Sequence, residues 1–132
     1  MEKEPLRTLS IEGTKSQYFT PRVVMNVENG KCEISGESYL EDTHFFYQPI
    51  IDWLDRYIKE IKGSIEFSIK LNYYNTSSSK YILEILRNLK IYKESGGKVE
   101  IFWYYPEIDT NILEEAQDCK EFLGLDITIL PM

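Results

Sequence analysis

A run of hydroxyl side chains lies where a strand-like segment gives way to a helix-like segment. Thr76, Ser77, Ser78 and Ser79 follow Asn75 directly, and all five residues are of types that favour the start of a helix. One helix needs only one cap. Any of the four hydroxyls could also carry a phosphate, which free backbone N–H groups and the helix dipole stabilise at a helix start. The run therefore predicts either a plain cap or a phosphorylation site.

Three carboxylates, Glu37, Glu41 and Asp42, gather in a second segment, residues 36–42, which we expect to be a loop. Ligand sites in open α/β sheets form at the carboxyl ends of parallel strands. If the preceding strand is parallel to its neighbour, the acidic loop and the hydroxyl run lie at one edge of the sheet. A phosphate adds about −1.5 to −2 charge at neutral pH, so it would make this edge strongly negative.

Tyrosine is abundant, with ten residues in the chain. Its ring offers apolar area with a polar tip, which suits a surface that meets a partner. Tyr39 lies in the acidic loop, while Tyr74 and Tyr104 end strand-like runs. We expect the last two to be exposed and predict that all three contact a partner. An equally good interpretation is that these rings only cover an open sheet face.

Other chemistry has little support in the sequence. His44 is the single histidine, and no cysteine or histidine stands at zinc-ligand spacing from it. The nucleophile elbow and the glycine-rich phosphate loops are absent. Cys32 and Cys119 are far apart, and we expect free thiols, with Cys32 packed in a strand. No catalytic residue, metal or cofactor is therefore predicted, although a carboxylate site for Mg²⁺ or Ca²⁺ stays open.

Composition bounds the class of protein. The 132 residues are 42% hydrophobic and 28% charged, which is typical of a soluble globular chain, and we expect one domain over residues 1–132. The net charge is −7 without a basic cluster, so binding to nucleic acid or to an anionic membrane is not expected. The start, MEKEPLRTLS, lacks the apolar run of a signal peptide. We therefore expect a cytoplasmic protein.

Two strands and a long helix are predicted in the first half of the chain. Residues 23–27 and 31–35 form a hairpin around the turn Asn29-Gly30, and a weaker strand covers residues 6–11. A helix follows over residues 43–61, with a kink at Pro49 or a true start near Tyr47. Its expected buried stripe is Ile50, Leu54, Tyr57, Ile58 and Ile61.

Strands and helices alternate in the second half. The odd-numbered residues from Ile65 to Tyr73 are apolar, and polar residues separate them, which predicts a strand over 64–73 with one buried face. The chain as a whole reads β-β-α-β-α-β-α-β, typical of a two-layer α/β fold with a mixed sheet and helices mainly on one face. The remaining elements are a helix over 76–95, a strand over 98–105, a helix capped by Asp109 or Thr110, and a strand over 126–130.

Four segments together resemble the SiaC family of bacterial regulatory phosphoproteins. They are EGTKSQYFTPRV, GESYLEDTHFFYQPIIDWLDRYI, LNYYNTSSSKYILEILRNLK and SGGKVEIFWYY, and they span nearly the whole chain. The Asn-Thr-Ser-Ser box between a strand and a helix is the most specific of these features. Leu40 departs from the pattern, because the family usually has proline there.

The resemblance implies a fold similar to the STAS domain of anti-sigma factor antagonists. It also implies that Thr76 is the phosphoacceptor, held by Asn75, Ser77 and Ser78. By the same resemblance, a partner kinase adds the phosphate and a PP2C-like phosphatase removes it. The unmodified protein would bind and promote a diguanylate cyclase, raising cyclic di-GMP and favouring biofilm. On this basis we expect a non-enzymatic switch, whose open sheet face would also suit a homodimer.

Three alternatives remain at this stage. The first is a STAS-like antagonist that releases a sigma factor in a stress pathway. The second is a small enzyme that uses the loop carboxylates, for example with Mg²⁺. The third is a small-ligand sensor that uses the aromatic face. The two regulatory readings share the hydroxyl switch and differ only in their partner.

Overall fold

A mixed six-stranded sheet forms one layer of the computed structural model, which describes residues 4–15 and 19–132. Its strand order is β1-β4-β5-β6-β7-β8, with β1 and β4 antiparallel to their neighbours and the other strands parallel. The strands are β1 (Leu9–Ile11), β4 (Arg22–Met25), β5 (Lys31–Ser38), β6 (Ile65–Tyr74), β7 (Val99–Tyr105) and β8 (Ile127–Pro131). A short hairpin that the sequence did not predict pairs β2 (Thr14–Lys15) with β3 (Phe19–Thr20).

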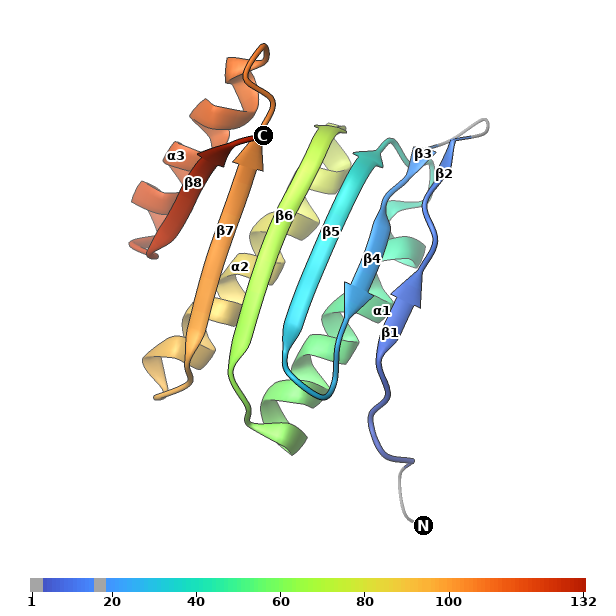
Figure 1. Ribbon diagram of the computed structural model, residues 1–132, viewed down its shortest axis with the longest axis vertical. Helices are drawn as coiled ribbons and strands as arrows, with labels where there is room; N and C mark the ends of the chain where they lie inside the picture. The colour runs from blue at the N-terminus through green and yellow to red at the C-terminus, as the bar shows by residue number, and fades with distance from the viewer. Residues whose placement is uncertain (1–3, 16–18) are drawn as a thin grey trace.

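Within the same described residues, three helices form the second layer, behind the sheet in Figure 1. They are α1 (Thr43–Arg56), which continues into the π-helical turn η1 (Tyr57–Ile61), α2 (Thr76–Glu94) and α3 (Thr110–Leu123). The predicted two-layer α/β class with a mixed sheet is therefore confirmed, while its likeness to STAS domains stays a prediction. Within the described residues, none of the helices combines the length and apolar character that a membrane span requires.

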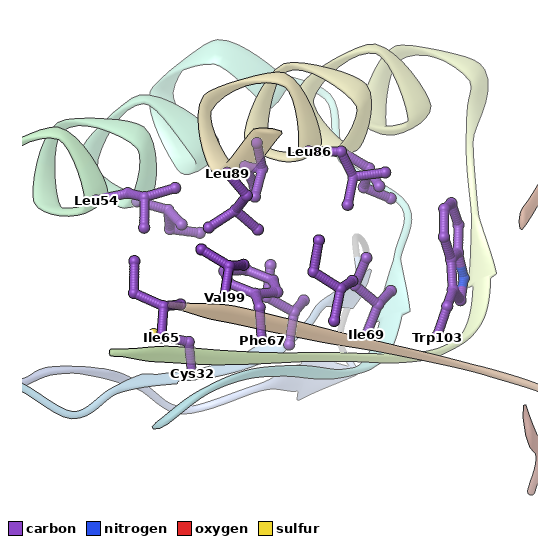
Figure 2. Packing of buried hydrophobic residues seen from close by; sticks show 14 of the residues in the cluster. Cys32, Leu54, Ile65, Phe67, Ile69, Leu86, Leu89, Val99 and Trp103 are labelled. Carbon is purple, nitrogen blue, oxygen red and sulfur yellow. The ribbon is translucent and has the colours of Figure 1, made fainter. Parts of the chain in front are cut away.

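The core lies between the two layers (Figure 2). Leu54, Leu86 and Leu89 reach down from α1 and α2 toward Phe67 and Ile69 of β6, and all five are buried. Alternation in β6 produces this arrangement, because successive side chains of a strand point to opposite faces. Glu66, Ser68 and Lys70 consequently lie on the face without helices and remain half-exposed. The predicted apolar stripe of α2, from Ile82 to Tyr92, is also buried.

The hairpin turn is longer than predicted. Strand β4 ends at Met25, and a five-residue turn follows, in which the Asn26 side chain accepts from the backbone N–H of Glu28 at 2.9 Å. Gly30 closes the turn with φ +73°, which favours glycine. A Cβ there would lie 1.8 Å from the carbonyl oxygen of Ser64, so this glycine also allows β5 to approach the start of β6.

Helix α1 begins at Thr43, so the alternative start near Tyr47 is wrong. Pro49 lies inside the helix, and the irregular part is the last turn. There the backbone N–H of Lys62 donates to the carbonyl of Tyr57 at 2.9 Å, five residues back. This wider turn takes Ile61 off the apolar stripe and leaves it 45% exposed, against the prediction that it would be buried.

A register shift changes the end of β6. Its pairing with β5 passes from Gly36–Leu71 to Glu37–Tyr73, so β6 holds one extra residue at this point. An extra residue reverses the alternation that follows it. Tyr73 is consequently 47% exposed, whereas the Tyr74 hydroxyl reaches α3. The sequence predicted the opposite, a buried Tyr73 and an exposed Tyr74.

The same pairing extends β5 beyond its predicted end. Residues 36–38 belong to the strand, so the expected loop over 36–42 is reduced to 39–42. The extension places Ser38 inside the protein, with no exposed surface, beside the start of α2. The first strand is shorter than predicted, since β1 begins at Leu9 and not at residue 6, and the other predicted strands and helices agree with the structure to within about two residues at their ends.

Candidate functional site

The carboxyl ends of β5 and β6 meet at one edge of the sheet, as predicted. The backbone N–H of Asn75 donates to the carbonyl of Ser38 at 3.0 Å, and its side-chain amide donates to the carbonyl of Leu40 at 3.2 Å. The loop that follows β7 is tied to this edge through α3, because the Tyr74 hydroxyl donates to Glu115 at 2.6 Å. Backbone pairing and one long side chain thus bring these three segments together.

Asn75 caps α2. Its side-chain oxygen accepts from the backbone N–H of Ser78 at 3.1 Å and from the hydroxyls of Ser77 at 3.2 Å and Ser78 at 2.5 Å. A cap of this kind satisfies a backbone donor that has no partner inside the helix. In α2 it also fixes two neighbouring hydroxyls, so Asn75 organises the hydroxyl run.

Three buried hydroxyls form a network beneath the cap. The Ser38 hydroxyl lies 2.7 Å from that of Tyr47 and 2.8 Å from that of Ser78, and none of the three residues has exposed surface. Burial raises the pKa of Tyr47 to about 12, partly offset by hydrogen bonds from Ser38 and Ser78. Since unpartnered buried hydroxyls are costly, this network holds β5, α1 and α2 in one arrangement.

A second contact ties the starts of α1 and α2 together. The hydroxyl of Thr43, the first residue of α1, lies 2.7 Å from the hydroxyl of Ser77. Thr43 is only 6% exposed, so this bond is largely shielded from water. Ser77 therefore shares its hydroxyl between the cap residue Asn75 and helix α1.

Thr76 differs from its neighbours. It is the first residue of α2 and is exposed, and its hydroxyl bonds to no residue that the structure describes. Ser78 is fully buried, and Ser77 and Ser79 are half-buried. Of the four hydroxyls in the run, Thr76 is the one that a modifying enzyme reaches most directly.

The acidic residues surround this edge, but their roles differ. Glu41 and Asp42 are exposed and Glu37 is half-buried. Asp42 also caps α1, because its carboxylate accepts from the backbone N–H of Phe45 at 3.0 Å. Residues 36–45, 73–79 and 105–111 contain no lysine or arginine. The loops at this edge therefore carry negative charge without a compensating cation of their own.

The predicted contact tyrosines are divided between two surfaces. Tyr39 is 47% exposed, and its ring centroid lies 6.1 Å from that of Tyr73. Tyr74 is half-buried and bonded to α3. Tyr104, which was predicted to be exposed, is half-buried and lies with Lys70 on the open sheet face, where the ammonium is 5.0 Å from the ring centroid. Tyr39 therefore lies at the edge of the sheet, whereas Tyr104 lies on the open face. That these tyrosines contact a partner stays a prediction.

The described residues do not bring three histidine, cysteine or acidic side chains into one group that could hold a metal ion. The His44 ring nitrogen lies 3.0 Å from the Tyr81 hydroxyl, away from both cysteines in sequence. Burial raises the pKa of the Cys32 thiol to about 12, so this thiol is protonated at neutral pH. Cys32 is 2% exposed and packs in the core as predicted.

Residues 11–132 match the model of a known family, described as SiaC family regulatory phosphoprotein. The chain belongs to the SiaC family. The resemblance carried by the Asn-Thr-Ser-Ser box is therefore confirmed at the level of the family.

One relative found by sequence and two solved structures of SiaC come from Pseudomonas aeruginosa. An uncharacterised protein of strain UCBPP-PA14 is 30% identical over 113 residues, which are 86% of this chain and 87% of the relative. The crystal structure of apo-SiaC is 29% identical with a TM-score of 0.84, covering 93% of this chain and 98% of that one. SiaC in complex with the diguanylate cyclase SiaD, which it activates, is 28% identical with a TM-score of 0.85, covering 94% and 99%.

Sequence reasoning missed several residues that build the site. The sequence placed Thr43 at a helix start, Ser38 inside the loop over 36–42 and Tyr47 in a helix. It gave none of them a role at the hydroxyl run. A signal was present for Tyr47, because a tyrosine on the inner stripe of a helix needs a buried partner for its hydroxyl. Nothing local to the sequence pairs Ser38 or Thr43 with α2.

Proposed function

We propose that this SiaC-family chain is a non-enzymatic switch in which phosphorylation of Thr76 controls the binding of a diguanylate cyclase. The observation that carries the proposal is which hydroxyls of the run are hydrogen-bonded and which are exposed. Asn75, Ser77 and Ser78 are engaged in the cap network. Neither Thr76 nor Ser79 has a bonded hydroxyl among the described residues, but Ser79 is half-buried and Thr76 is exposed. The family description as regulatory phosphoproteins supports a modified residue, and the exposed hydroxyl is the one suited to it.

The position of Thr76 determines what a phosphate would do. At the first residue of a 19-residue helix, the phosphate lies near free backbone N–H groups and the positive end of the helix dipole. It therefore leaves the helix intact. Its effect falls on the surface instead, where it adds bulk and about two negative charges beside Glu41 and Asp42.

The proposed partners follow from the family. SiaC of Pseudomonas aeruginosa forms a complex with the diguanylate cyclase SiaD as its activator, which favours a cyclase over a sigma-factor regulator. On this proposal, a kinase and a PP2C-like phosphatase set the state of Thr76, and the unmodified protein binds the cyclase in the cytoplasm. Glu37, Tyr39, Glu41 and Asp42 lie at the edge that would meet it. A homodimer on the open sheet face stays a separate prediction.

Affinity capture from native lysate tests the proposal. The immobilised proteins are the unmodified wild type, Thr76→Glu and Thr76→Gln, where the last adds bulk without charge. Thr110→Glu is the matched control, since Thr110 is the exposed first residue of α3 and follows its cap residue Asp109 as Thr76 follows Asn75.

Mass spectrometry identifies the captured proteins and maps phosphate on the native chain. We expect a cyclase on the wild type and on Thr110→Glu, its loss on Thr76→Glu, and phosphate on Thr76. Equal capture by all four proteins together with an unmodified Thr76 would show that the hydroxyl run is only a helix cap.

A further inference from the structure

The first turn of α1 lies next to the proposed phosphoacceptor and presents an unusual side chain. Phe45 is 79% exposed on this turn, which the Asp42 cap holds through its bond to the Phe45 backbone N–H. A large exposed aromatic ring is a common anchor of protein interfaces. Phe45 therefore offers an apolar contact beside the acidic loop.

One hydrogen bond connects this turn to α2. The Thr43 and Ser77 hydroxyls are 2.7 Å apart, and Ser77 follows Thr76 directly in the chain. Thr43 is 6% exposed, so its hydroxyl depends on Ser77 rather than on water. The Ser77 hydroxyl also donates to the Asn75 side-chain oxygen at 3.2 Å, a distance longer than the usual range of about 2.5–3.0 Å for a hydroxyl donor and therefore a weak bond.

A phosphate on Thr76 would compete for the Ser77 hydroxyl. It brings three strongly accepting oxygens next to that hydroxyl, and charged acceptors form stronger hydrogen bonds than a neutral amide oxygen. Making this bond by rotation of the Ser77 side chain about χ1 moves the Ser77 oxygen away from Thr43. The buried Thr43 hydroxyl then lacks a partner, and the first turn of α1 opens more often.

We infer that the Thr43–Ser77 hydrogen bond is a positioning link that couples the state of Thr76 to the first turn of α1, and that this turn presents Phe45 to an apolar pocket of the effector protein. The inference rests on the proposed function and deepens it. It makes Phe45 part of the surface that phosphorylation regulates, because the shielded Thr43–Ser77 bond connects the turn that carries Phe45 to the residue after Thr76. Thr43 and Ser77 are positioning residues, since neither needs to touch the partner.

The deciding experiment needs no partner. Hydrogen exchange of the amides of residues 45–47 is followed by NMR in the unmodified chain and in the chain carrying phosphothreonine at position 76. We expect phosphate to raise their exchange about fivefold, the change that the loss of about one net hydrogen bond produces. Amides of residues 85–92, deep in α2, serve as the internal control and should not respond.

Variants separate a link from a merely structural contact. In Ser77→Ala, exchange at residues 45–47 should already be fast, and phosphate should change it less than twofold. Ser77→Thr keeps the hydroxyl and should keep the fivefold response, and Ser79→Ala should behave as the wild type. A wild-type response below twofold, or a full response in Ser77→Ala, would overturn the inference.

The partner contact is measured separately. Phe45→Ala should weaken capture of the cyclase at least fivefold, whereas Phe122→Ala, which removes a 72% exposed ring from α3, should leave it unchanged. Equal capture by the two variants would show that Phe45 is not part of the partner surface.

If phosphate changes capture without changing exchange at residues 45–47, the proposed function stands and the link falls. If exchange responds and capture does not, the link stands and the proposed function falls.

Discussion

Replacement of Asn75 tests the architecture that presents Thr76. The Asn75 side chain accepts from the Ser78 backbone and from two hydroxyls, and it donates to the carbonyl of Leu40. Asn75→Ala removes all four contacts. Asn75→Asp keeps the accepting oxygens and loses only the donated hydrogen bond, so the pair of variants separates the cap from the tie to the acidic loop.

The expected loss of stability follows from these contacts. Loss of a helix cap costs about 1 kcal/mol, and each net hydrogen bond contributes about 1 kcal/mol more. Ser77 and Ser78 keep other partners, Thr43 and Ser38, so their hydroxyls are not fully orphaned. Asn75→Ala should therefore lower the free energy of unfolding by about 2–3 kcal/mol. Asn75→Asp should lower it by only about 1 kcal/mol, because it loses one donated hydrogen bond and keeps a cap that the helix dipole favours.

Urea denaturation followed by far-ultraviolet circular dichroism measures both values. For a chain of this length, about 1 kcal/mol corresponds to roughly 4 °C in Tm, so thermal melting provides an independent check. The slope of the unfolding free energy against urea should not change. An equal loss in the two variants, or a loss below about 1 kcal/mol in Asn75→Ala, would refute the view that Asn75 organises the hydroxyl run.

Two further predictions concern the stability of the fold. Gly30→Ala should destabilise the fold by more than about 2 kcal/mol, since its Cβ would meet the Ser64 carbonyl. The Cβ in Gly96→Ala meets nothing within 4 Å, so that variant should cost only the strain of positive φ, about 1 kcal/mol. Urea titration of both variants would contradict this if the losses were equal. The raised pKa of Tyr47, about 12, means that its stabilising contribution is complete below pH 10 and is lost as pH rises from about 10 to 12. Wild type should lose roughly 2 kcal/mol more than Tyr47→Phe over that interval, and parallel pH profiles would contradict this prediction.

Local patterns predicted much of this fold because they reflect local physics. The stripe of α2 repeats at helical spacing, and Asn75 is a residue type whose side chain caps a helix. The strand β6 alternates as a sheet with one buried face requires. These features need no knowledge of the rest of the chain, so they were predicted with nearly correct ends.

Other features depend on contacts between distant segments. The extra residue in β6 is decided by pairing with β5 and reverses the roles of Tyr73 and Tyr74. The wide turn η1 is decided by one backbone hydrogen bond, and it exposes Ile61. Neither feature leaves a distinct trace in the residue types nearby.

The candidate site follows the same division. The hydroxyl run and the acidic loop were evident from the sequence, since each is continuous in the chain. The buried group of Ser38, Tyr47 and Ser78 was not, because its members come from β5, α1 and α2. The same holds for the Thr43–Ser77 bond, which joins residues 34 positions apart.

The most direct test of the central claim is the affinity of the cyclase for two forms of this chain, unmodified and carrying phosphothreonine at position 76. A third form with phosphothreonine at position 110 controls for added charge at a helix start. Isothermal titration should show the Thr76 phosphate weakening binding by about 5- to 150-fold, the usual range of regulatory coupling, with the Thr110 phosphate close to neutral. Affinities that agree within twofold for all three forms would contradict the account.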